Sequence, residues 1–195
     1  MINMSFAIKS KVKNFAKKTG LLPERKRRKV CFIITNRIHY ARQQLLLEQL
    51  KGDPGIELQL IVGGSALLDK YGGVLPRLEE KGFEIHEQML NMVEGGNHAA
   101  MAKTAGLAVL ELANTFQKLD PEIVLIRGDR FEQLAAAMTA AYLNKTVAHI
   151  EGGDVTGTID ESVRHAITKL SHFHFVTNEE SHRRVLQMGE SPAYV

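Results

Sequence analysis

Short apolar runs alternate with helical patterns along most of this chain, and that alternation restricts its fold more than any other feature. Residues 123–126 and 146–150 are apolar runs with the length of buried parallel strands. Between them, apolar residues recur at steps of three and four from Phe131 to Tyr142, as on one face of a helix. This order of elements predicts two parallel strands joined by a crossover helix.

The same alternation starts at residue 30 and predicts six strands separated by helices. We expect strands at residues 30–35, 56–62, 83–86, 123–126, 146–150 and 173–176. Helical patterns occupy residues 39–50, 67–81, 98–118, 131–142, a segment after Thr158, and 179–188. The pattern predicts an α/β fold, a doubly wound parallel sheet that is Rossmann-like. No GxGxxG motif follows the first strand, so we expect no dinucleotide cofactor.

Acidic side chains fall where the predicted strands end or helices begin. Asp129 follows the fourth strand, Glu151 follows the fifth, and Asp160 lies in the first turn after Thr158. Thr158 is the expected N-cap of that helix, and Glu161 completes a capping box. Ligands bind at the carboxyl ends of strands in such sheets. Each acidic residue also fits a structural role, as a turn residue, a paired surface carboxylate or a first-turn residue favoured by the helix dipole.

Two runs resemble a known enzyme family: GDRFE at residues 128–132 and HIEGGDVTGTIDESVRHAITKLSH at residues 149–172. They are similar to the N-terminal domain of the hydrolysing UDP-N-acetylglucosamine 2-epimerases of sialic and legionaminic acid synthesis. The resemblance extends from about residue 30 to residue 188. It implies the N-terminal half of a GT-B-type architecture, in which two Rossmann-like domains hold the site in the cleft between them.

The resemblance also implies a reaction. UDP is eliminated from the sugar to give a 2-acetamidoglucal, and water then adds to release N-acetylmannosamine. The family's catalytic acidic residues match Asp129, Glu151 and Asp160, and which of them takes the proton from C2 stays open. Clustered carboxyls suit this chemistry because they raise one another's pKa, so that one stays protonated while another is ionised. Alternatives are the same chemistry on a legionaminic-pathway UDP- or GDP-sugar, and a non-catalytic half-domain that acts as an assembly module.

Three arginines are candidate substrate-binding residues. Arg37, just after the first strand, matches a basic position near the nucleotide diphosphate in related enzymes, and a surface arginine is the alternative. A fixed guanidinium suits a departing phosphate. Arg130 and Arg164 are expected to orient the carboxylates by ion pairing.

The other candidates surround Glu151. His149 is either a packed strand-end histidine or a site group. Gly152 and Gly153 are expected to let the backbone approach the sugar. The histidines form no zinc-like cluster in the sequence, so we expect no metal.

Residues 1–29 form a basic arm, with ten Lys and Arg against Glu24 alone, whereas the remainder holds 15 basic and 21 acidic residues. Met4, Ile8, Val12 and Phe15 recur at helical steps in this arm. The pattern predicts either an amphipathic helix that contacts a partner or an anionic membrane, or a solvated arm. A basic run without a recognised motif does not indicate nucleic-acid binding.

The expected organisation is this arm, a Rossmann-like domain at residues 30–190, and no second, nucleotide-binding domain. Cys31 is the only cysteine, so no intrachain disulfide is expected. Neither a secretory signal nor an apolar run of about 20 residues is present. These features favour a cytoplasmic enzyme. We also expect a homo-oligomer.

Overall fold

The computed structural model describes residues 26–195, so the predictions for residues 1–25 lie outside the described residues. Its centre is one parallel sheet, made of β1 (Arg28–Ile34), β2 (Ile56–Gly63), β3 (Ile85–Met89), β4 (Ile123–Arg127), β5 (Thr146–Ile150) and β6 (Phe173–Phe175). The strand order is β3-β2-β1-β4-β5-β6, and every pairing is parallel. The predicted doubly wound, Rossmann-like sheet of six strands is therefore confirmed.

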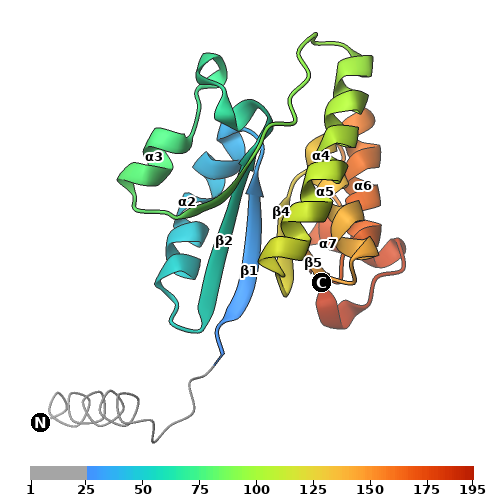
Figure 1. Ribbon diagram of the computed structural model, residues 1–195. Helices are drawn as coiled ribbons and strands as arrows, with labels where there is room; N and C mark the ends of the chain where they lie inside the picture. Colours follow the sequence, from blue (N-terminus) through green and yellow to red (C-terminus); the bar gives the residue numbers. More distant parts are fainter. Residues whose placement is uncertain (1–25) are drawn as a thin grey trace, which may run out of the picture.

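Helices cover the sheet on both faces (Figure 1). On one face lie α2 (Arg37–Gly52), α3 (Leu75–Glu80) and the 3₁₀ helices η1 (Gly64–Leu67) and η2 (Asp69–Tyr71). The other face carries α4 (His98–Leu119), α5 (Phe131–Tyr142) and α6 (Ile159–Leu170). After β6 the chain forms α7 (Glu179–Gln187) and η3 (Pro192–Tyr194).

Strand β1 is apolar from Val30 to Ile34 because both of its faces are buried there. Cys31 and Ile33 pack with the helices α4, α5 and α6, whereas Val30, Phe32 and Ile34 pack with α2 and α3. Right-handed crossovers place the helices on opposite faces, since the chain moves outward from β1 in one direction and from β4 in the other. The direction changes between β1 and β4, and ligands bind at such a switch point.

The third strand begins later than residues 83–86 predicted, because Phe83 belongs to the turn before β3. Phe83 is 6% exposed, and its N–H donates to the carbonyl oxygen of Leu78 at 2.9 Å. The ammonium of Lys51 lies 4.9 Å from the centre of its ring. The prediction placed Phe83 at the start of the strand because the residue is apolar, but a turn and not strand pairing buries it.

The helical segment expected at residues 67–81 is divided into η1, η2 and α3. Gly72 ends η2 with φ +76, a left-handed conformation that glycine adopts without strain. At the start of the described chain, Arg28 already pairs with Ile56 in the sheet, so the last residues of the basic arm belong to β1. Within residues 26–195, no helix combines the length and the apolar character needed to cross a membrane.

Candidate active site

The turn after β4 places Asp129 at the switch point. Gly128 turns the chain with φ +79, and its N–H donates to the carbonyl oxygen of Ile150 at 2.9 Å. This bond extends the pairing of β4 with β5 by one step beyond the strands. Arg130 is then the N-cap of α5, so Asp129 lies between a strand end and a helix start.

Glu151, after β5, has an unusual backbone conformation. Its φ is +70, in the left-handed region that residues with a side chain rarely adopt. Its N–H donates to the carbonyl oxygen of Phe175 at 2.8 Å, which fixes this peptide against β6. Such a conformation costs on the order of 1–2 kcal/mol and is concentrated at functional sites. The strain therefore agrees with a functional role for Glu151.

A buried arginine holds the side chain of Glu151. Arg127, the last residue of β4, is 4% exposed, and its Nη2 donates to Oε1 of Glu151. Arg42, an exposed residue of α2, has its Nη1 4.0 Å from the same oxygen. The sequence gives no signal that Arg127 is buried, because a charged residue at the end of an apolar run is typical of the exposed start of a turn.

Asp129 is held by a second buried arginine. Arg164 of α6 donates through Nη2 to Oδ2 of Asp129 and through Nη1 to the carbonyl oxygen of Asp154, at 2.8 Å in the second case. The ion pair expected for Arg164 is therefore present. Burial nevertheless raises the pKa of Asp129; Arg164 opposes the shift, and the charges of Asp160 and Glu151 add to it. The three predicted acidic residues are thus close enough to influence one another's ionisation.

The first turn of α6 differs in detail from the predicted capping box. Thr158 is the N-cap, and its hydroxyl accepts a hydrogen bond from the N–H of Asp160 at 3.3 Å. Glu161, however, accepts from the N–H groups of Thr156 and Gly157, at 3.1 and 2.8 Å, and the bond from Gly157 lowers its pKa. Glu161 therefore fixes the preceding loop, and Asp160 makes no hydrogen bond through its carboxylate to any residue in the described part of the chain.

His149 is a packed histidine at the end of β5. Its Nε2 lies 2.9 Å from the carbonyl oxygen of Gly128, and its Nδ1 lies 3.2 Å from the hydroxyl of Thr168. Burial lowers the pKa of His149 to about 4, so the ring is neutral at pH 7. Since a carbonyl only accepts, the proton is on Nε2. His149 therefore connects the turn before Asp129 with α6 through its two ring nitrogens. A direct contact of His149 with the substrate stays a prediction.

Gly152 and Gly153 are required by packing within the protein. A Cβ on Gly152 would lie 3.0 Å from Oγ1 of Thr168. Gly153 has φ +82, and a Cβ there would lie 2.5 Å from the carbonyl oxygen of Ser181 in α7. The predicted approach of this backbone to a sugar is a separate role that these contacts do not test.

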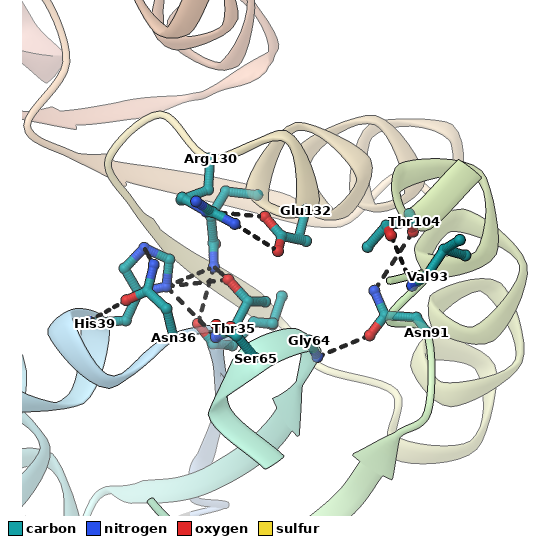
Figure 2. A network of polar contacts seen from close by, with 12 residues as sticks. Thr35, Asn36, His39, Gly64, Ser65, Asn91, Val93, Thr104, Arg130 and Glu132 are labelled. Carbon is teal, nitrogen blue, oxygen red and sulfur yellow. Dashed lines mark hydrogen bonds and ion pairs between the residues drawn. The ribbon is translucent and has the colours of Figure 1, made fainter. Parts of the chain in front are cut away.

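Arg130 pairs with a carboxylate that the sequence analysis did not identify. Its Nε and Nη2 donate to the two oxygens of Glu132, at 3.2 and 3.1 Å, and Glu132 is fully buried (Figure 2). The guanidinium lies 4.7 Å from the centre of the Phe131 ring. Arg130 was expected to orient the site carboxylates, but its ion pair is with Glu132 instead. Arg37 is exposed at the first position of α2 and contacts the turn at Gly72.

A buried polar network lies beside this pair, between β1 and α5 (Figure 2). Nδ1 of His39 lies 3.3 Å from the hydroxyl of Thr35 and 3.2 Å from the amide nitrogen of Gln133. Burial, together with the charges of Arg127 and Arg130, lowers the pKa of His39 to about 3. This histidine is therefore neutral. His39, Glu132 and Gln133 occupy polar positions of helical patterns, where the sequence carries no signal of burial.

In residues 26–195, no three His, Cys, Asp or Glu side chains gather in an arrangement that could hold an ion.

The site contains two carboxylates held by buried arginines and a third carboxylate in the first turn of α6. The exposed Arg37 and Arg42 of α2 add positive charge. Such a site suits proton transfer near an anionic group.

Comparison with known proteins agrees with this geometry. A model of the UDP-N-acetylglucosamine 2-epimerase family matches residues 48–195. UDP-N,N'-diacetylbacillosamine 2-epimerase (hydrolyzing) of Legionella pneumophila is 38% identical over 163 residues, which are 84% of this chain and 43% of that protein. UDP-N-acetylglucosamine 2-epimerase of Neisseria meningitidis is 32% identical over 168 residues, 86% of this chain and 44% of that protein.

Solved structures show the same fold. A UDP-N-acetylglucosamine 2-epimerase superposes with a TM-score of 0.76 at 21% identity, over 87% of this chain and 47% of that one. The Neisseria meningitidis enzyme bound to UDP-GlcNAc gives 0.73 at 21% identity, over 86% and 44%. The chain therefore has the fold of the N-terminal half of a GT-B-type architecture and spans less than half the length of these relatives. Since the family match covers more than half of its residues, the chain belongs to the UDP-N-acetylglucosamine 2-epimerase family.

Proposed function

We propose that this chain is the catalytic N-terminal half of a hydrolysing nucleotide-sugar 2-epimerase that converts UDP-N-acetylglucosamine into N-acetylmannosamine and UDP. The observation that supports this most is the acidic cluster at the switch point, in which Asp129 has a raised pKa beside Asp160 and Glu151. The activities named for the Legionella pneumophila and Neisseria meningitidis relatives support the reaction and the substrate class.

The proposed reaction has two stages. In the first, one carboxylate takes the proton from C2 of the sugar while UDP leaves from C1, which gives a 2-acetamidoglucal. In the second, water adds to C1 and a proton returns to C2, which releases N-acetylmannosamine. A carboxyl with a raised pKa is suited to donate a proton and an ionised one to accept it, so a cluster with different environments supports both steps. Asp129, Glu151 and Asp160 are the proposed catalytic residues.

Substrate binding is proposed to involve Arg37, Arg130, Arg164 and the segment from His149 to Gly153. Arg37 is exposed at the first position of α2, where a guanidinium is available to a diphosphate. Arg130 is partly exposed while Glu132 orients it, so it presents a fixed cation at the start of α5. Arg164 acts through Asp129, which it contacts.

The experiment requires the rest of a nucleotide-binding cleft. The full chain is mixed with the separately expressed C-terminal half of the Legionella pneumophila relative, and released UDP and N-acetylmannosamine are quantified. Asp129→Asn, Glu151→Gln and Asp160→Asn should each reduce kcat by more than tenfold, since acid–base groups contribute about 10²–10⁴-fold. Glu179→Gln, at a side chain that is 94% exposed, is the control and should leave kcat unchanged. Wild-type kcat in all three site variants would refute the assignment.

The isolated chain should fold but not turn over substrate. Its six-stranded sheet and two hydrophobic clusters form within residues 26–195, so a cooperative thermal transition is expected. Remote contacts with the nucleotide position the reacting sugar in enzymes of this kind. We therefore expect no shift of the transition with millimolar UDP-N-acetylglucosamine. Steady UDP release by the purified chain alone would contradict this proposal.

The same mixed assay tests two alternatives. The higher identity to the Legionella pneumophila relative, 38% against 32%, favours the same chemistry on a UDP- or GDP-linked sugar of the legionaminic type. Competition between UDP-N-acetylglucosamine and UDP-N,N'-diacetylbacillosamine in the mixed assay would decide. The second alternative, a non-catalytic assembly module, would assemble with the C-terminal half without turnover.

Partners and location are proposals from the sequence. We propose a cytoplasmic homo-oligomer whose basic arm contacts an anionic membrane or a partner. Each basic residue near such a surface contributes on the order of 1 kcal/mol. Deleting residues 1–25, which leaves β1 intact, should abolish salt-sensitive co-sedimentation with anionic vesicles. If the full and shortened chains sediment alike, the arm does not bind membranes.

A further inference from the structure

We propose that Arg127 is a positioning residue for Glu151: it holds one oxygen of the carboxylate, Oε1, and leaves the other, Oε2, to exchange the proton with substrate. The catalytic consequence rests on the proposed function. The positioning itself rests on contacts within this chain and is tested separately.

Burial makes the pairing obligatory for Arg127. Its side chain is 4% exposed, and the guanidinium is a cation with five N–H donors. A buried cation without a counter-charge is strongly destabilising. In the described part of the chain, Glu151 is the only acidic side chain in ion-pair contact with it, and the Nε of Arg127 has no hydrogen-bond partner there. Glu151 is therefore the anion that compensates Arg127.

The two oxygens of Glu151 have different surroundings. Oε1 accepts from Arg127 and lies 4.0 Å from Nη1 of Arg42. Oε2 makes no hydrogen bond with any residue from 26 to 195, and it faces the Asp129 turn, where a Cβ on Gly128 would lie 4.0 Å away. The Glu151 side chain is 25% exposed, so a substrate can reach part of it.

The backbone of Glu151 supports the same conclusion. With φ at +70 and its N–H bonded to Phe175, the Cα–Cβ direction is set by the sheet rather than by the loop. Arg127 then fixes the end of the side chain from the neighbouring strand. Asp129 has the equivalent partner in Arg164, which approaches from α6. Each strand-end carboxylate thus has its own buried arginine.

The first test uses the chain alone and is read by NMR. In ¹⁵N-arginine-labelled protein, the Nη signals of Arg127 should show hindered rotation about the Nε–Cζ bond. In Glu151→Gln, rotation about the Nε–Cζ bond of Arg127 should no longer be hindered. In Asp129→Asn, only the rotation of the Arg164 guanidinium should become free. A purely structural arginine would keep its rotation hindered in Glu151→Gln. Hindered rotation that persists in Glu151→Gln, or is absent from the wild type, overturns the proposal.

The second test measures turnover of the full chain mixed with the C-terminal half. Arg127→Lys keeps the positive charge but replaces the planar guanidinium that holds Oε1 of Glu151. A displacement of about 1 Å at a reacting group lowers the rate by about 10²-fold. We expect kcat to fall by about tenfold to a hundredfold with KM within about threefold. Arg183→Lys, at an exposed side chain of α7, is the matched control and should change neither by more than about twofold, because exposed pairs contribute little.

The two tests separate the possible failures. If the wild-type mixture is inactive, the proposed function fails, and the NMR result still decides whether Arg127 holds Glu151. Equal losses in Arg127→Lys and Arg183→Lys would overturn the positioning role. If Arg127→Lys does not fold, the Glu151→Gln spectrum of Arg127 carries the test.

Discussion

Two glycines of the loop after Glu151 offer a stringent stability test, because they share a backbone conformation and differ in packing. Gly153 has φ +82 and Gly157 has φ +71. A Cβ on Gly157 has nothing within 4 Å, whereas on Gly153 it would lie 2.5 Å from the carbonyl oxygen of Ser181 and 2.9 Å from Cγ2 of Val185. Gly157→Ala therefore measures the backbone cost, and Gly153→Ala adds the overlap with α7.

The magnitudes follow from these contacts. A side chain in the left-handed region costs about 1 kcal/mol, and this is the whole effect expected for Gly157→Ala. At Gly153 the neighbour is backbone, and it must withdraw by about 0.9 Å to reach the ordinary contact distance of 3.4 Å. Overpacking of this kind costs typically about 1–3 kcal/mol, so we expect about 3 kcal/mol in total. The two variants should then differ about 30-fold in their unfolding equilibrium constants.

Urea denaturation followed by circular dichroism measures the difference. With a slope of about 2 kcal/mol/M, the midpoint should fall by about 0.5 M for Gly157→Ala and about 1.5 M for Gly153→Ala. The displaced α7 also holds the loop through Arg184, which donates to the carbonyl oxygen of Gly153. If the two midpoints fall equally, α7 does not pack against this loop as the structure has it.

Three further predictions concern ionisation and reactivity. Asp160→Asn removes a like charge and should lower the pKa of Asp129. Arg164→Gln removes an opposite charge and should raise that pKa. Carboxyl ¹³C NMR measures both shifts. Since folding raises this pKa, the contribution of Asp129 to stability is present below about pH 3.9 and lost as pH rises through the folded value. His149, with a pKa of about 4, should keep a single neutral form with the proton on Nε2 from pH 6 to 8 in ¹⁵N spectra, and a titrating ring would contradict its burial. Burial raises the pKa of Cys31, so a thiol reagent should modify it only in denaturant, and fast modification of the native chain would show that β1 is open.

The sequence by itself determined the fold class and the position of the acidic site. Apolar runs of strand length between helical patterns leave few arrangements other than a doubly wound parallel sheet, and all six strands were located from them. Asp129, Glu151 and Asp160 could be placed at one edge because parallel strands end at the same edge of a sheet. The start of β3 was misplaced, since Phe83 is buried by a turn and not by strand pairing.

Only the tertiary structure decided which charges are buried and what they contact. Arg127 and Arg164 are separated from their partners by 24 and 35 residues in the chain, and no local pattern specifies such a distance. Glu132 lies two residues from Arg130, yet its complete burial depends on the turn at Gly64, which packs against it from β2. Periodicity reports which face of a strand or helix is apolar. A buried charge is compensated by an opposite charge on another strand or helix. These elements come together only when the sheet is assembled.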